Sequence, residues 1–217
     1  MKIVVISDTH DRHEDFALLE GGVPEGDVLI HCGDMFQLYD PSGAQVRAID
    51  DWFGRQKFER IFCTGGNHDL ALEAAVRSGR PPFRNAEYLQ DRLVEHGGRT
   101  FYGAPWTPKL RTHAFYLSDD DMARRWALIP QEVDVLITHP PPQGVLDLSS
   151  RGRSHGCAEL TGAIATRRIG VHCFGHVHAS HGRQDRPEAE TGARISLNAS
   201  SVSSALEVVH KPWVIEI

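Results

Sequence analysis

Short apolar runs recur along the chain, and each ends at glycine or at polar residues. Five of them are followed directly by residues that can bind metal ions, and they span 2–7, 27–32, 60–64, 133–138 and 171–174. The runs are rich in β-branched residues and are bounded by Gly or Asp, which is typical of buried strands. We therefore predict five strands, with the polar residues that follow them gathered along one edge of a sheet. Open α/β folds place their sites at such an edge.

Stretches with helical periodicity alternate with these runs. They cover 45–53, 70–78, 119–129 and 158–168. The alternation favours βαβ units and a mixed or parallel sheet. Further short extended runs, which suggest a second sheet packed on the first, lie at 87–89, 92–94, 100–102, 194–198 and 206–217. The predicted fold class is α/β, a two-sheet mixed β sandwich flanked by helices.

We expect residues 1–217 to form a single domain without a cap domain. A chain of 217 residues, 41% of them hydrophobic, can supply one sizeable core. The polar stretch 180–192 is predicted to be an exposed hairpin or loop. The first apolar run is shorter than the apolar region of a signal peptide, and no other run is long enough to span a bilayer. We therefore expect a cytoplasmic location.

Charge and cysteine content narrow the possible functions. A net charge of -6 argues against nonspecific polyanion binding over the whole surface, although it leaves room for a local basic groove. The cysteines show no Cys-x-x-Cys spacing, so we interpret them as buried thiols in a reducing compartment rather than as a disulfide framework or a zinc ribbon. They are Cys32, Cys63, Cys157 and Cys173.

The residues after the five runs form five short signatures. In chain order they are Asp8-Thr9-His10, Gly33-Asp34, Gly66-Asn67-His68-Asp69, Thr138-His139 and Gly175-His176-Val177-His178. Carboxylates and imidazoles make a mixed oxygen and nitrogen ligand set, which suits Mn, Fe or Zn better than Mg or Ca. Two such ions about 3.5–4 Å apart can activate a nucleophile and clamp a phosphate. The signatures together indicate a two-metal phosphoesterase.

Taken singly, the signatures carry different weight. Asp8-Thr9-His10 and Gly33-Asp34 are also ordinary turn sequences. Gly66-Asn67-His68-Asp69 is the most specific, because Asn is an unusual metal ligand. His176 and His178 alternate along an extended segment, so both rings can point to one site.

The order of the signatures resembles that of the calcineurin-like binuclear metallophosphoesterase superfamily. The resemblance implies the calcineurin-like fold and two divalent transition metal ions, Mn above all and Fe or Zn as alternatives. It implies one ion held by Asp8, His10 and His178, the other held by Asn67, His139 and His176, and Asp34 bridging the two. His68 would then protonate the leaving group or stabilise the transition state, with Asp69 as a candidate to orient it.

Further segments are similar to the metallophosphoesterase-domain-containing family, whose members act on nucleotide phosphodiesters. They are 87–91, 101–108, 126–130 and 138–147. One departure is Pro140 after His139, where vertebrate members have Gly. Size and motifs also resemble a bacterial, manganese-dependent branch associated with DNA-repair helicases and ligases. That resemblance implies DNA endonuclease activity and a functional association with DNA-repair enzymes.

The favoured hypothesis is a Mn-dependent DNA endonuclease in which a metal-bridging hydroxide attacks the diester in line. One alternative is a phosphodiesterase for small cyclic nucleotides, which the acidic net charge favours. Another is a metal-free scaffold on the same fold, although such a chain would be expected to lack ligands or the catalytic histidine.

Three further residues are candidates to contact the substrate. Arg151 and Arg153 carry guanidinium groups, which suit phosphate recognition, and His155 lies near the loops of the site. A solvated loop explains the two arginines equally well. His31 and His172 lie inside apolar runs, and we interpret them as hydrogen-bonded core histidines.

Overall fold

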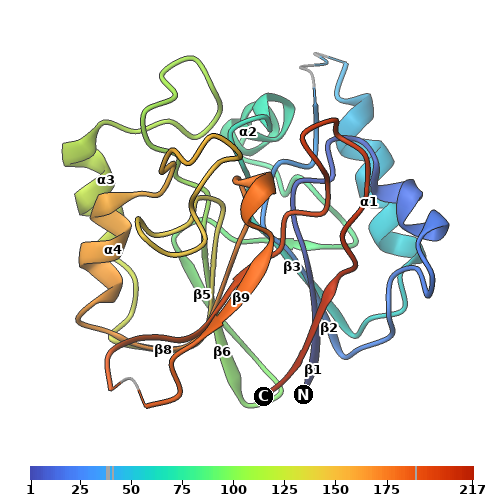
Figure 1. Cartoon of the computed structure of the whole chain (residues 1–217). Coiled ribbons are helices and arrows are strands. Elements are labelled where there is room, and N and C mark those ends of the chain that lie inside the picture. Colours follow the sequence, from blue (N-terminus) through green and yellow to red (C-terminus); the bar gives the residue numbers. More distant parts are fainter. Residues whose placement is uncertain (38–39, 41, 189) are drawn as a thin grey trace.

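Two β-sheets form the centre of the computed structural model, which describes residues 1–37, 40, 42–188 and 190–217 (Figure 1). The strands of the first sheet are β1 (Lys2–Ile6), β2 (Val28–His31), β3 (Arg60–Cys63), β4 (Glu87–Tyr88) and β11 (Trp213–Glu216), in the order β11-β1-β2-β3-β4. Those of the second are β5 (Arg92–His96), β6 (Arg99–Ala104), β7 (Glu132–Thr138), β8 (Arg168–Phe174), β9 (Gly182–Asp185) and β10 (Gly192–Asn198), in the order β5-β6-β7-β8-β10-β9.

Parallel strands make up the interior of both sheets. In the first sheet β1 to β4 are parallel and β11 pairs antiparallel with β1, with Ile3 opposite both Ile215 and Val28. In the second sheet β6, β7, β8 and β10 are parallel, while β5 and β9 are antiparallel edges. The carboxyl ends of neighbouring parallel strands therefore open into a common set of loops.

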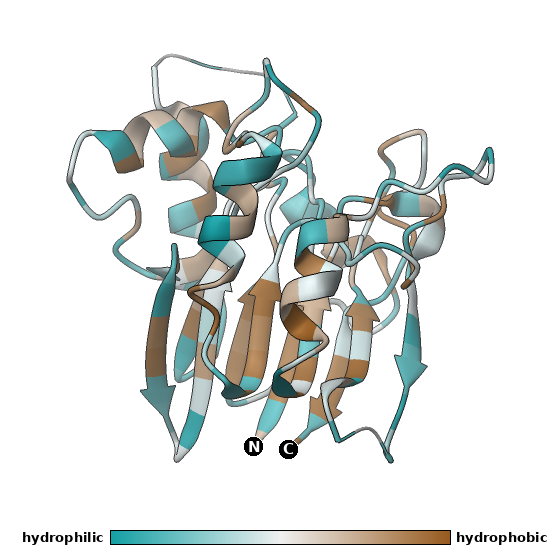
Figure 2. Ribbon diagram, turned by 90° about the vertical axis from the view of Figure 1, so that its left-hand side faces the viewer, coloured by the Kyte–Doolittle hydropathy of each residue, from teal (hydrophilic) through white to brown (hydrophobic). Residues whose placement is uncertain are grey.

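Side chains along the parallel strands alternate between two cores. Ile3 and Val5 of β1 lie in one cluster with Val135 of the second sheet. Val4 lies in the other cluster, together with Trp52 of a covering helix. The strands are consequently apolar on both faces. In Figure 2 the central strands are accordingly coloured mostly as hydrophobic along their length. Burial on both faces explains why the runs in the sequence are continuous rather than alternating.

Helices cover the outer faces of the two sheets. They are α1 (Ala44–Arg55), α2 (Leu70–Arg77), α3 (Asp119–Trp126) and α4 (Ala158–Ile164), with short 3-10 turns at His13–Leu18 and His178–Ser180. Figure 1 shows α1 on the right, α3 and α4 on the left, and α2 at the top between them. The predicted fold class, two mixed sheets flanked by helices, is confirmed. Within the described ranges no helix has the length and apolar character needed to cross a membrane.

The structure corrects several predicted elements. The five metal-motif strands do not share one sheet, because β1, β2 and β3 belong to the first and β7 and β8 to the second. Of the runs assigned to the second sheet, β4 and β11 join the first. Helix α4 ends at Ile164, so Arg168 begins β8 instead of ending a helix. The stretch 206–217 is a strand only over β11, whereas 180–192 contains the expected hairpin partner, β9.

Candidate metal centre

The loops after β1, β2, β3, β7 and β8 meet at the carboxyl ends of both sheets and bring the predicted ligands together. Ligand atoms lie within 4.8 Å of one another in three groups, namely Asp8, His10 and His178; His10, Asp34 and His68; and Asp34, His139 and His176. His10 and Asp34 each belong to two groups. The groups therefore form one continuous cluster to which both sheets contribute.

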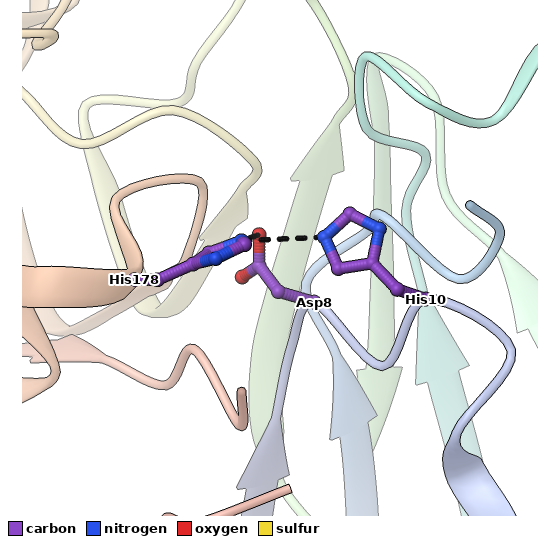
Figure 3. A group of neighbouring side chains, drawn as sticks. All are labelled: Asp8, His10 and His178. Atoms are coloured by element: carbon purple, nitrogen blue, oxygen red, sulfur yellow. Dashed lines mark hydrogen bonds and ion pairs between the residues drawn. The ribbon is translucent and has the colours of Figure 1, made fainter. Parts of the chain in front are cut away.

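The first group converges on a small volume. The Nε2 atoms of His10 and His178 are 3.2 Å apart, and His178 Nε2 is 3.5 Å from Oδ1 of Asp8. Figure 3 shows the two rings reaching toward each other with the Asp8 carboxylate between them. Two imidazole nitrogens and a carboxylate oxygen that converge in this way fit a divalent transition metal ion.

The second part of the cluster surrounds His139. Its Nε2 lies 3.0 Å from Oδ1 of Asn67 and 3.3 Å from Oδ2 of Asp34. The same Asp34 oxygen is 3.9 Å from Nε2 of His10. Asp34 thus lies between the two halves of the cluster, and this placement fits the bridging role that the resemblance implies.

Backbone carbonyls orient two of the candidate ligands. Nδ1 of His10 is 3.1 Å from the carbonyl oxygen of Phe36, and Nδ1 of His139 is 3.0 Å from that of Cys32. A carbonyl can only accept, so in the neutral ring Nδ1 carries the proton and Nε2 presents a lone pair to the cluster. When neutral, both histidines therefore have the tautomer that a metal ion requires.

Several ligand positions adopt left-handed backbone conformations that are unfavourable for residues other than glycine. The φ angles are 52° at Asp8, 44° at His10, 52° at Asp34 and 69° at His176. Backbone hydrogen bonds hold them, including Asp8 N to the Gly33 carbonyl at 2.9 Å. The unfavourable backbone conformations are concentrated at the cluster. They lower local stability but orient these side chains toward one another.

The electrostatics of the cluster favour bound positive charge. Burial alone would raise the pKa of Asp34, but the neighbouring His139 outweighs that effect and the pKa is lowered. Burial likewise opposes ionisation of Asp8, yet its hydrogen bond with His178 and nearby histidines hold its pKa well below the usual range. The pKa of His139 is raised to about 9, because Asp34 outweighs the opposing effect of burial. Both carboxylates are therefore anionic at neutral pH.

Asp8 depends on a residue that the sequence signatures did not reveal. Ser200 Oγ donates a 2.8 Å hydrogen bond to Oδ2 of Asp8, and both residues are fully buried. The backbone N–H of His176 donates to both carboxylate oxygens at 3.0 Å. Ser200 lies 192 positions from Asp8 in the chain, in a region without any metal signature, so local sequence patterns give no sign of this contact.

His68 lies at the cluster but is held differently from the other histidines. Its Nδ1 is 3.1 Å from the carbonyl oxygen of Gln37, and its backbone N–H donates to Oδ1 of Asp34 at 2.8 Å. The ring is also perpendicular to that of His10, with centroids 4.9 Å apart. The Gln37 carbonyl, and not Asp69, is the partner of the His68 ring.

Asp69 instead forms hydrogen bonds with two loops of the site. Its carboxylate accepts backbone hydrogen bonds from Met35 at 2.8 Å, Phe36 at 3.1 Å and Gly66 at 2.8 Å. Burial, and secondarily the charge of Asp34, raises the pKa of Asp69 to about 8. This carboxylate joins the loop after β2 to the loop after β3, so it fixes the position of His68 through the backbone.

A surface cavity of about 430 Å³ opens over the cluster. Its lining includes Asn67, His68, His176 and His178 from the cluster, together with residues of the segments 108–113, 149–155 and 177–179 and Ser204. Of the residues expected to contact substrate, His155 lines the cavity. Arg151 and Arg153 are exposed in the same loop and lie outside the lining.

His31 and His172 lie in the core, as expected from their apolar surroundings. Both are fully buried, and their Nε2 atoms hydrogen-bond the hydroxyls of Thr9 at 3.0 Å and Thr138 at 2.8 Å, respectively. Burial lowers the pKa of each to about 3, so both rings are neutral in the folded protein. The four cysteines are also buried and free of disulfides.

The sequence is similar to those of known metallophosphoesterases. The family model described as "Calcineurin-like phosphoesterase" matches residues 1–180. The human "Metallophosphoesterase domain-containing protein 1" is 31% identical over 242 residues, which cover all of this chain and 71% of the relative. A UPF0046 protein of Caenorhabditis elegans is 30% identical over 234 residues, covering all of this chain and 75% of that protein.

Solved structures share the fold at low sequence identity. One has a TM-score of 0.67 and 16% identity, with 92% of this chain and 90% of that chain covered. The protein TT1561 of Thermus thermophilus has a TM-score of 0.54 and 12% identity, with 92% and 88% covered. At these identities the likeness concerns the fold alone.

Proposed function

The chain belongs to the calcineurin-like phosphoesterase family, whose chemistry is metal-dependent phosphoester hydrolysis, and we propose that it cleaves phosphodiester bonds of DNA as a Mn-dependent endonuclease. The observation that carries the proposal is the position of Asp34, whose Oδ2 lies 3.9 Å from Nε2 of His10 and 3.3 Å from Nε2 of His139, one candidate ligand of each ion. A carboxylate in this position can contact both of two divalent ions about 3.5–4 Å apart.

The donor set fits two such ions. Asp8, His10 and His178 would hold one, Asn67, His139 and His176 would hold the other, and Asp34 would contact both. When bound, the ions lower the pKa of a water molecule and neutralise charge on the phosphate. Carboxylate, amide and imidazole donors without thiolates favour Mn, Fe or Zn.

His68 supplies the proton transfer. Because its Nδ1 faces the Gln37 carbonyl, the nitrogen that exchanges protons with the substrate is Nε2. With Nδ1 held by this carbonyl, Nε2 is the atom that would donate a proton to the leaving oxygen. General acid catalysis of this kind contributes about 10²–10⁴-fold to the rate, most for a poor leaving group.

Two substrate classes receive support from the cavity. Exposed Arg151 and Arg153 beside it favour a DNA strand that continues across the surface. A cyclic nucleotide is the second candidate, because about 430 Å³ lies within the range for small-ligand sites and the net charge of the chain is -6.

An assay with Mn distinguishes these candidates. Plasmid DNA, single-stranded DNA, 2',3'- and 3',5'-cyclic nucleotides and a phosphomonoester are compared with the purified protein, and Asp34→Asn controls for contaminating nucleases. Nicking of plasmid that is absent in the variant is expected. Rapid turnover of a cyclic nucleotide without nicking would replace DNA with the second candidate. Plasma mass spectrometry that finds no transition metal, even after metal addition, would overturn both.

A further inference from the structure

One wall of the cavity is a loop, residues 107–117, that is hydrogen-bonded to the cluster of candidate metal ligands. The N–H of Ala114 donates to the carbonyl of Asn67 at 3.0 Å, and the N–H of Phe115 donates to the carboxylate of Glu73 at 3.1 Å. The N–H of Thr107 donates to the Phe115 carbonyl at 2.9 Å, and this hydrogen bond joins the two ends of the loop. The backbone of this wall is therefore held in place relative to the candidate ligand Asn67.

Lys109 is the cation on that wall. It lines the cavity and adopts a left-handed backbone with a φ of 65°, which is unfavourable for a lysine. Among the residues that the structure describes, none forms an ion pair with Lys109, and no Asp or Glu lines the cavity. In a chain with 29 acidic and 23 basic residues, a wall that carries a lysine and excludes carboxylates is suited to an anion.

His113 adds a hydrogen-bond donor to the same wall. Its ring meets that of His68 edge to face, with centroids 5.8 Å apart. Its Nδ1 is buried and has no hydrogen-bond partner within the described ranges. A buried N–H without an acceptor is costly, so the proton of the neutral ring belongs on Nε2, which can donate into the cavity.

We propose that Lys109 and His113 bind a second phosphate group of the substrate, next to the scissile phosphodiester. This inference rests on the proposed function, in which the metal cluster holds the scissile phosphate. Lys109 and His113 are then available to bind another anion. The cavity of about 430 Å³ has room for more than one phosphate. The adjacent phosphate of a nucleic acid, or the terminal phosphate of a short oligonucleotide, has the required chemistry.

Calorimetric titration of the Mn-loaded protein tests the proposal without relying on turnover. Thymidine 3',5'-bisphosphate should bind about tenfold more tightly than either thymidine monophosphate, since a lysine–phosphate contact is a charge-assisted hydrogen bond. Lys109→Ala should reduce that preference to less than about threefold, and Lys109→Arg should retain it. His113→Ala should weaken the preference by about threefold, as expected for a neutral donor.

Arg111→Ala is the matched control, because Arg111 is an exposed cation of the same loop that does not line the cavity. It should leave the preference for the bisphosphate unchanged. Equal affinity of the wild type for all three ligands, absence of binding, or a preference that survives Lys109→Ala would overturn the inference. Failure of the proposed function is separable, because it would appear as loss of diester hydrolysis in a protein that still prefers the bisphosphate.

Discussion

Replacing Ser200 by alanine should weaken metal binding at the group formed by Asp8, His10 and His178. The Ser200 hydroxyl is a buried donor to Oδ2 of Asp8 at 2.8 Å. After the substitution the N–H of His176, 3.0 Å from both oxygens, and the ring of His178, 3.5 Å from Oδ1, still contact that carboxylate. Asp8 would keep its charge but lose the group that fixes one of its two oxygens.

The size of the effect follows from these contacts. A hydrogen bond to a charged group contributes about 1.5–3 kcal/mol to stability, and Ser→Ala removes only one oxygen atom, so little packing is lost. Unfolding in EDTA should therefore become easier by about 1.5–3 kcal/mol. For metal binding, loss of a residue that orients a ligand typically reduces affinity about 10–100-fold.

Equilibrium denaturation in EDTA and Mn titration by calorimetry measure the two effects. Ser201→Ala is the control, because Ser201 is also buried but its hydroxyl donates to the Ala199 carbonyl, at 3.4 Å, and not to a candidate ligand among the described residues. One of the two Mn sites should weaken in Ser200→Ala, and both should be unchanged in Ser201→Ala. Unchanged Mn affinity at both sites in Ser200→Ala would refute the role assigned to this hydroxyl.

Other substitutions probe the remaining parts of the site and core. His68→Ala should retain metal, measured by plasma mass spectrometry, but slow turnover about 10²–10⁴-fold for an alkyl diester and less for a nitrophenyl diester; equal losses would contradict a proton donor. Asp34→Asn should lower metal content below that of the wild type after identical loading. The pKa of His172 is lowered to about 3, so its contribution to stability is complete above pH 6.5 and is lost as the pH falls toward 3. Denaturation in EDTA at pH 7 and pH 5 should therefore show a smaller fall in stability for His172→Gln than for the wild type.

The positions of the candidate ligands could be inferred from the sequence because each lies within a few residues of the end of a buried strand. Strand β1 ends at Ile6, two residues before Asp8, and β8 ends at Phe174, two residues before His176. Parallel strands then bring those residues to one end of the fold. Local sequence and strand direction are sufficient for this inference, and the structure places all seven predicted ligands in one cluster.

The division of the strands between two sheets could not be inferred in the same way. Strands β2 and β7 look alike in sequence, since both are buried on two faces, and only their tertiary neighbours distinguish them. The same limit hid Ser200 and the Gln37 carbonyl, whose contacts depend on loop conformation. Lys109 likewise has no signature, because its relevance comes from the cavity that it lines.

Each set of candidate ligands is divided between the two sheets. Asp8 and His10 follow the first sheet and His178 follows the second, while Asn67 and His139 are divided in the same way. Neither sheet alone presents a complete set of ligands for either ion. Each ion would therefore connect the two halves of the sandwich at the end where the ligand loops have unfavourable backbone conformations. The binding energy of the metals would then also stabilise the geometry that the reaction requires.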